Sequence, residues 1–171
     1  MYCCEKFKYK ASTVFLIEDH KWPMVNFALS LRVGSLPDPF GKAGLTRILF
    51  NMLLRGTKQQ NRIDFNRSLE NLGSEIDPIV GTELAVLRGV CLKRHLEETM
   101  DLLQEALHEP RFEQEEFDKL LIDIREELKQ ERDDDDALAE LFLRRALFGE
   151  HPLGRSPLGE WKDLQHISLD D

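Results

Sequence analysis

The sequence has 171 residues, which is enough for one ordinary hydrophobic core. Hydrophobic residues make up 42% of it and charged residues 32%, as in a soluble globular protein without a membrane-spanning helix. The formal net charge of −9 argues against a broad basic surface, and we therefore expect no nucleic acid as a partner.

The first residues and the cysteines bear on the compartment. Residues 1–6 lack the basic-then-apolar pattern of a signal peptide, which favours the cytoplasm. A periplasmic or mitochondrial location stays open if a presequence has been removed. The three cysteines do not suggest a disulfide framework. Cys91 lies in an apolar run and is expected in the core, whereas Cys3 and Cys4 are expected in a disordered tip.

The first half of the chain contains most of the predicted strands. Alternating or β-branched runs predict strands at residues 13–17, 25–33, 74–80 and 84–92. Apolar positions at helical spacing predict helices at 44–55 and 63–72, each followed by a glycine. Pro78 predicts that the strand at 74–80 lies at a sheet edge or bulge.

The second half is predominantly helical by the same criteria. Helices are predicted at 95–107, 113–132 and 137–148, and a further helix could begin at Ser168. The run Asp133–Asp136 is interpreted as a solvated loop that caps the third of these helices. Because strands come early and helices late, we expect one α+β domain over residues 1–171, with two layers: an antiparallel-rich mixed sheet and helices packed on one face.

The helix at 44–55 has two distinct faces. One is an apolar stripe at positions i, i+3, i+4, i+7 and i+8, formed by Leu45, Ile48, Leu49, Met52 and Leu53. The other carries Arg47, Phe50 and Asn51 at i, i+3 and i+4. Metallopeptidases that hold zinc with two histidines one helical turn apart, and a glutamate beside them, use this spacing.

The residues that frame this helix, Gly44-Leu45 and Gly56-Thr57, carry a resemblance to a known family. The stretch resembles the motif Gly-Leu-x-His-x-x-Glu-His-x-Leu-x-x-Gly-Thr of the M16 metallopeptidases (insulinase, pitrilysin, mitochondrial processing peptidase). Shorter matches follow the family's order over nearly the whole chain: Gly34-Ser35 with Asp38, Leu72-Gly73-Ser74, Glu126-Glu127-Leu128 and His151-Pro152-Leu153-Gly154. The resemblance implies an M16 N-terminal domain, and because the family domain continues with further strands, we expect this one to be incomplete at its C-terminus.

The resemblance also implies where a zinc site would lie. Arg47 and Asn51 stand at the positions of the two histidines, and Phe50 stands at the position of the catalytic glutamate. The family's third ligand is a glutamate on a later helix, which corresponds to Glu127, 76 residues after Asn51 (127 − 51), or to Glu126 if the alignment shifts by one. Only one ligand position is retained, so we expect neither a bound metal cofactor nor zinc hydrolysis.

Two interpretations of the charged groups stay open. If Glu127 faces the 44–55 helix, Arg47 could pair with it and supply the positive charge in place of zinc. Alternatively, Arg47 and Glu127 are both solvated charges on polar helix faces.

The resemblance implies a non-catalytic M16 protein that acts as a partner or structural subunit of an M16 zinc peptidase complex. Another M16 subunit or self-association is the expected partner, since an incomplete sheet leaves an edge exposed. Extended peptide could add along the strand formed by Ser74, Glu75, Ile76, Asp77, Pro78 and Ile79, although the proline removes one backbone donor. The alternatives are an active zinc metalloendopeptidase with atypical ligands and an architectural core subunit without peptide affinity.

Overall fold

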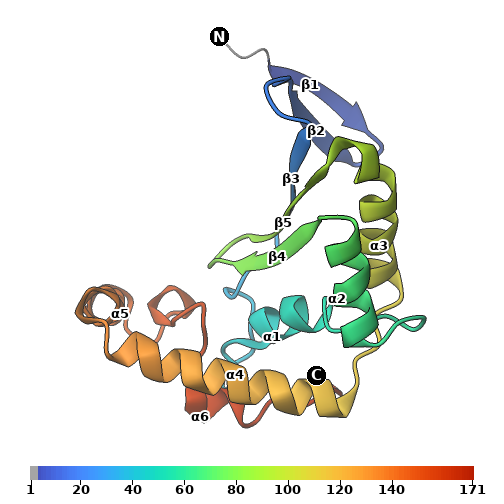
Figure 1. Cartoon of the computed structure of the whole chain (residues 1–171). Coiled ribbons are helices and arrows are strands. Elements are labelled where there is room, and N and C mark those ends of the chain that lie inside the picture. Colours follow the sequence, from blue (N-terminus) through green and yellow to red (C-terminus); the bar gives the residue numbers. More distant parts are fainter. Residues whose placement is uncertain (1–3) are drawn as a thin grey trace.

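The structure is a computed structural model that describes residues 4–171, and its strands form two separate sheets (Figure 1). The first sheet is the hairpin of β1 (Cys4–Tyr9) and β2 (Ser12–Ile17). The second has the strand order β3-β5-β4, with bounds Met24–Leu31, Ala85–Leu92 and Glu75–Val80 respectively. All pairings between these strands are antiparallel, which confirms the predicted antiparallel-rich sheet. Strand β4, which contains Pro78, lies at an edge.

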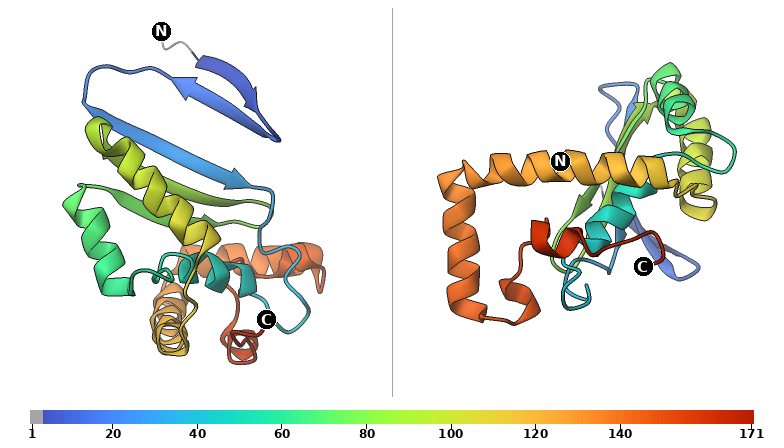
Figure 2. Two further views of the ribbon diagram at one scale, coloured as in Figure 1. Left: turned by 90° about the vertical axis from the view of Figure 1, so that its right-hand side faces the viewer. Right: turned by 90° about the horizontal axis from the view of Figure 1, so that it is seen from below.

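The helices form the second layer and one side of the molecule. They are α1 (Leu45–Met52), α2 (Arg62–Asn71), α3 (Leu96–His108), α4 (Gln114–Arg132), α5 (Asp135–Phe148) and α6 (Trp161–Leu164), with short 3₁₀ turns at Lys93–His95 and Pro152–Gly154. Helices α2 and α3 cover one face of the three-stranded sheet, while α4 runs past α1 at the end of the molecule opposite the hairpin (Figures 1 and 2). The predicted α+β fold is thus confirmed. Among residues 4–171, no helix is long and apolar enough to cross a membrane.

Two groups of buried side chains form the core. The first lies between the sheet and its helices and consists of Phe50, Phe65, Leu69, Ile76, Ala85, Leu87, Leu103 and Ala106. The second lies between α1, α4 and the C-terminal segment and consists of Ile48, Met52, Phe117, Leu120, Ile124, Leu164 and Ile167. Helix α1 contributes to both groups, so it joins the sheet to α4. Cys91 is buried in β5, as predicted.

Burial on two sides changes the interpretation of α1. The predicted apolar stripe includes Leu49, but that side chain is exposed, whereas Phe50 is only 3% exposed and packs in the first core group. The prediction of an apolar stripe assumes that the helix has one buried face. Because α1 is enclosed between a sheet and another helix, it buries side chains over a wider part of its circumference. Position 50, where the family has its catalytic glutamate, is therefore part of the core here.

Asp38 fixes the start of α1 although it lies outside the helix. Its buried carboxylate accepts hydrogen bonds from the backbone N–H groups of Gly44 (2.8 Å) and Thr46 (3.1 Å), and the Thr46 hydroxyl lies 2.6 Å from the same carboxylate. Gly44 has no side chain with which to cap the helix, so Asp38 satisfies N–H groups that would otherwise be unpaired. The carboxylate also lies at the positive end of the helix dipole.

The N-terminal hairpin corrects one expectation. Cys4 does not lie in a disordered tip; it begins strand β1 and pairs with Ile17. The pattern was missed because residues 4–9 contain only two aromatic residues between charged ones. Cys3 lies outside the described residues. No residue of either hairpin strand is buried, and Phe15 is 61% exposed.

The end of the chain corrects another expectation. Residues 168–171 form a turn, with a hydrogen bond from the Asp171 N–H to the Ser168 carbonyl, and the last short helix is α6 instead. Leu164 and Ile167 from this segment are buried against α1 and α4. The Asp134 side chain accepts hydrogen bonds from the N–H groups of Asp136 and Ala137, so the prediction that the acidic run caps the following helix is confirmed. The predicted loop at 133–136 is too long, because α5 already begins at Asp135.

Candidate functional site

The side chain of Arg47 leaves α1 toward α4 and is almost completely buried, with 10% of it exposed. Its Nη1 donates a hydrogen bond to the Leu158 carbonyl at 3.1 Å, and its Nη2 contacts the Glu127 carboxylate. The structure therefore brings Arg47 and Glu127 together. Glu127 is 57% exposed, so the pair consists of a buried cation and a carboxylate that stays in contact with water.

A close approach of two glycines makes the contact with Leu158 available. Gly44 and Gly159 both have positive φ, at 100° and 83°. A Cβ on Gly44 would lie 2.6 Å from a Leu164 methyl carbon and 3.1 Å from the Gly159 Cα. Only glycine combines this backbone conformation with so little space. The loop at 158–159 can therefore lie against the start of α1, where the Leu158 carbonyl meets the arginine.

Asn51 and Phe50, the other two residues at the motif positions on α1, contact groups other than Glu127. The Asn51 amide donates to the backbone carbonyl of Arg47 at 2.9 Å, one turn back along the same helix. Phe50 points into the core between α1 and the sheet. Neither side chain has an ionisable group that could activate a water molecule.

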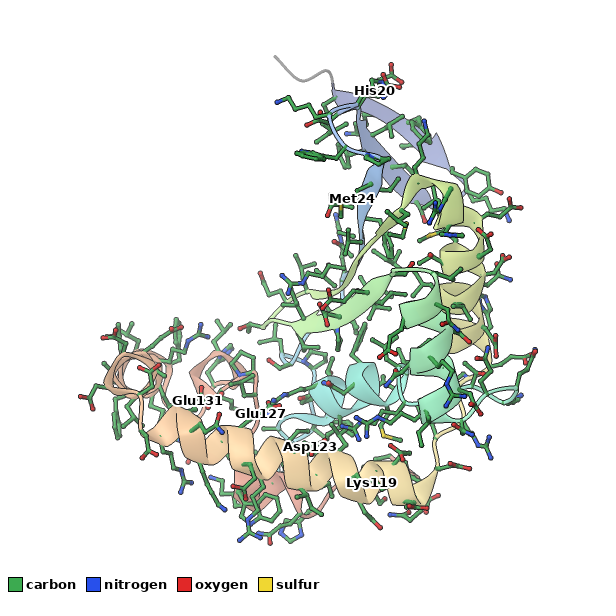
Figure 3. The ribbon with its side chains drawn as sticks, viewed as in Figure 1. His20, Met24, Lys119, Asp123, Glu127 and Glu131 are labelled. Carbon is green, nitrogen blue, oxygen red and sulfur yellow. The ribbon has the colours of Figure 1, made fainter. Side chains whose placement is uncertain are left out.

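The opposite wall is one side of α4. Figure 3 shows Lys119, Asp123, Glu127 and Glu131 at successive turns along this helix. Glu126, the other candidate for the third ligand position, instead pairs with Lys129 on the exposed side of α4, at 2.6 Å. The geometry therefore distinguishes the two neighbouring glutamates: Glu127 faces α1 and Glu126 does not contact Arg47.

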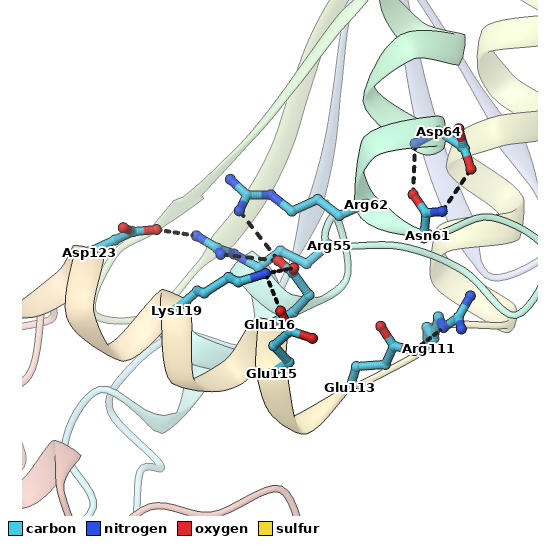
Figure 4. Close-up of polar contacts among 10 residues, drawn as sticks. All are labelled: Arg55, Asn61, Arg62, Asp64, Arg111, Glu113, Glu115, Glu116, Lys119 and Asp123. Atoms are coloured by element: carbon cyan, nitrogen blue, oxygen red, sulfur yellow. Dashed lines mark hydrogen bonds and ion pairs between the residues drawn. The ribbon is translucent and has the colours of Figure 1, made fainter.

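A second arginine extends the site beyond what sequence reasoning identified. Arg55 is 11% exposed; its Nη2 donates to Asp123 at 2.6 Å and its Nη1 lies 3.5 Å from the Glu116 carboxylate (Figure 4). The sequence contained a signal for Arg55, because positions 47, 51 and 55 are spaced four residues apart, which is the spacing of residues on one side of a helix. In the structure α1 ends at Met52, and Arg55 follows it in a turn. Asp123 likewise precedes Glu127 by one turn.

Glu116 is the centre of a small ion-pair network at the first turn of α4. Besides Arg55, it contacts Arg62 at 3.3 Å and Lys119 at 3.0 Å (Figure 4). Burial alone would raise the pKa of Glu116, but Lys119 and the two arginines outweigh burial and hold this pKa below its ordinary value. The carboxylate is thus kept ionised among three cations.

These elements enclose a pocket of about 470 Å³. It is lined by Arg47, Asn51, Arg55, Pro78, Ile79, Val80, Leu120, Asp123, Ile124, Glu127 and Leu158. The end of edge strand β4 therefore borders the same space as the two arginines. Of the predicted peptide strand, Ser74 to Ile79, only Pro78 and Ile79 line this pocket. Ser74 is buried, with its hydroxyl oxygen 2.7 Å from that of Thr99.

The donor set does not fit a zinc ion. Zinc sites use three protein ligands from histidine, cysteine and carboxylate side chains. Here Glu127 is the only such group at the three matching positions, and the guanidinium of Arg47, which is a fixed cation, already contacts it. Within residues 4–171, no three His, Cys, Asp or Glu side chains are grouped so that they could hold a metal ion.

The sequence is similar to members of one protein family. The family model for insulinase (peptidase family M16) matches residues 13–160. The non-peptidase homolog YmxG of Helicobacter pylori is 30% identical over 154 residues, which covers 90% of this chain and 36% of that protein. An uncharacterized zinc protease of Mycobacterium leprae is 28% identical over 137 residues, which covers 80% of this chain and 31% of that protein. The chain thus spans about a third of the length of these relatives.

Solved structures share the fold. The crystal structure of a peptidase M16 inactive domain from Pseudomonas fluorescens superposes with a TM-score of 0.88 at 20% identity, over 98% of this chain and 41% of that one. A protease from Helicobacter pylori superposes with a TM-score of 0.85 at 17% identity, over 99% of this chain and 41% of that one. Because the family model covers most of the chain, the chain belongs to the M16 (insulinase) peptidase family.

Proposed function

We propose that this chain is the N-terminal M16-like domain of a non-catalytic protein that serves as a partner or structural subunit of an M16 zinc peptidase complex. The observation that carries the proposal is the contact between the Arg47 guanidinium and Glu127, at the positions where the family has a histidine and its third zinc ligand. A cation cannot replace a ligand, and Phe50 cannot act as a general base. The name of the Helicobacter pylori relative, a non-peptidase homolog, supports the same proposal.

The partner role rests on exposed sheet edges. Strands β3 and β4 are both at the edge of their sheet, so each has one row of backbone groups without a strand partner among residues 4–171. Another M16 subunit or a second copy could cover β3. An extended peptide could add along β4. It would then lie beside the pocket, because Ile79 and Val80 belong to this strand and also line the pocket.

Metal content tests the central claim. The purified protein is incubated with zinc, desalted and measured by elemental analysis. We expect no retained zinc in the wild type. The matched control is the double variant Arg47→His, Asn51→His, which restores two ligands beside Glu127 and should retain zinc in a Glu127-dependent way.

Stoichiometric zinc in the wild type, lost on Glu127→Gln, would overturn the proposal. It would favour the second candidate, a zinc metalloendopeptidase with atypical ligands. The name of the Mycobacterium leprae relative, an uncharacterized zinc protease, supports that candidate. The third candidate, an architectural subunit without peptide affinity, is favoured by Pro78, which has no N–H to offer a peptide. Saturable binding of a labelled unstructured peptide distinguishes it from the peptide-contacting partner.

A further inference from the structure

The pocket between α1, α4 and the end of β4 is lined by two buried cations, Arg47 and Arg55, and each of them has one exposed carboxylate partner. We propose that this pocket binds a carboxylate of an extended peptide, with Arg47 as its principal anchor, and that Glu127 is the internal carboxylate that the ligand displaces. The proposal rests on the peptide contact along β4 under the proposed function, and adds to it the chemistry that the peptide must carry.

The difference in exposure between Arg47 and Glu127 is the first reason. Only 10% of the arginine side chain is exposed, against 57% for the glutamate. A buried guanidinium needs a counter-charge, and losing it is costly. A half-exposed carboxylate loses little when it turns back into water, because exposed ion pairs contribute little free energy. Exchange of Glu127 for a ligand carboxylate therefore keeps the buried arginine paired and costs the glutamate little.

Arg55 repeats this arrangement beside the first pair. Its side chain is 11% exposed, while its partner Asp123 is 52% exposed. Its Nη1 is buried 3.5 Å from the carboxylate of Glu116, which is itself only 11% exposed, so this ion pair stays in place. The Nη2 side of Arg55, which contacts the exposed Asp123, is therefore the side that a ligand would engage. A carboxylate has two acceptor oxygens and could engage both arginines.

The position of β4 is the reason to expect a peptide as the source of the carboxylate. Pro78, Ile79 and Val80 line the pocket, and the free edge of their strand is where extended chain would add. A peptide that follows this edge would place its end, or a side chain, against the arginines. The planar fork of a guanidinium matches a carboxylate geometrically. The carboxylate can come from the peptide's C-terminus or from an acidic side chain.

Three labelled peptides of one uncharged sequence separate these sources. One ends in a free carboxylate, one in an amide, and one in an amide but with a single internal glutamate. Binding to the full chain is measured by fluorescence anisotropy at constant ionic strength. We expect at least one carboxylate peptide to bind about tenfold more tightly than the neutral amide, as charge-assisted hydrogen bonds predict. Whichever carboxylate peptide does so identifies the source.

Two variants on α4 test the displacement. Glu127→Gln should tighten binding of the preferred carboxylate peptide several-fold, because the competitor is removed. The matched control is Glu126→Gln, which makes the same chemical change one residue away, on a side chain that pairs with Lys129, and it should leave the affinity unchanged. Arg47→Gln should abolish the preference for a carboxylate. Circular dichroism confirms that each variant is folded, and Glu127→Gln remains decisive if Arg47→Gln is not.

The outcomes separate this inference from the function on which it rests. If all three peptides bind equally well, the carboxylate site is wrong while peptide contact stands. If none binds, peptide contact fails and the site fails with it. If Glu127→Gln and Glu126→Gln change the affinity alike, Glu127 is not the displaced group and the proposal is overturned.

Discussion

Helix α1 and the β1–β2 hairpin are both short, yet they relate to the rest of the molecule in opposite ways. The helix is buried on two sides, capped by Asp38 and tied to α4 through Arg47. The hairpin has aromatic side chains but no buried residue in either strand. An apolar sequence therefore does not by itself decide burial; the number of elements that surround a segment does. Substitutions in α1 should accordingly cost much more than matched substitutions in the hairpin.

Phe50→Glu should have the largest effect. It places a carboxylate among apolar side chains and leaves the volume of the ring unfilled, so we expect a loss of about 3–5 kcal/mol in the free energy of unfolding. The matched change in the hairpin, Phe15→Glu, should stay within about 0.5 kcal/mol because that ring is exposed. Urea denaturation measures both, and Phe50→Leu, with a cost of about 1 kcal/mol, covers the case in which the charged variant does not fold.

This result would also show how readily the family's zinc motif could be rebuilt in this chain. Histidines at positions 47 and 51 would replace side chains that line the pocket, whereas a glutamate at position 50 would replace a side chain of the core. Equal costs for Phe50→Glu and Phe15→Glu would show that Phe50 is not packed as the structure has it, and the contrast between helix and hairpin would fail.

Loss of the Asp38 cap should have the next largest effect. Asp38→Asn keeps the shape but loses the charge that accepts two backbone N–H groups at the start of α1, which we expect to cost about 1–2 kcal/mol. The control is Asp19→Asn beside the hairpin, where an exposed carboxylate accepts one hydrogen bond from the Lys21 N–H at 3.0 Å. Its cost should be within about 0.5 kcal/mol. A comparable cost for both would mean that the cap does not hold α1.

What the sequence could and could not predict follows from the same contrast. The motif framed by Gly44 and Gly56 located α1, and the spacing to Glu127 located α4, because both are local patterns on single helices. Burial of Phe50 rather than Leu49 could not be read from one helical stripe, since it depends on a second packing partner.

Other parts of the site depend on contacts between distant segments. The Leu158 carbonyl reaches Arg47 only because Gly159 approaches Gly44, and no local pattern encodes that approach. Strand β1 could not be predicted from an apolar pattern, because charged and aromatic residues alternate along it and neither face is buried. Arg55, by contrast, could have been found from its four-residue spacing to Asn51.

A pH series should show a smaller effect at Glu116. Because its pKa is lower in the folded protein than its ordinary value of 4.5, the unfolded chain binds the proton more readily. The carboxylate's contribution to stability is therefore complete above about pH 4.5 and is lost as the pH falls through the lowered folded-state pKa. Glu116→Gln should reduce stability at pH 7 and make the decline toward pH 3 less steep, as urea midpoints across that range would show.

The hairpin supplies the control for this experiment. Glu5→Gln changes an exposed carboxylate on β1 and should leave the free energy of unfolding at pH 7 within about 0.5 kcal/mol of the wild-type value. A wild-type-like slope for Glu116→Gln would mean that the network around α4 does not stabilise the fold.

Two cation–π contacts, one on α4 and one in the hairpin, give the smallest expected difference in the free energy of unfolding. They compare the same kind of contact in the two regions. The Arg125 guanidinium on α4 lies 4.8 Å from the centre of the Trp161 ring, and the Lys6 ammonium on β1 lies 5.5 Å from that of Phe15. Tryptophan binds cations better than phenylalanine does, and such contacts contribute about 0.5–1 kcal/mol at exposed sites. Arg125→Gln should thus cost about 0.5 kcal/mol and Lys6→Gln less, as replicate urea titrations can resolve. If Lys6→Gln costs more, the hairpin contributes to the cooperative unit that unfolds with α1, and exposure would no longer separate the two regions.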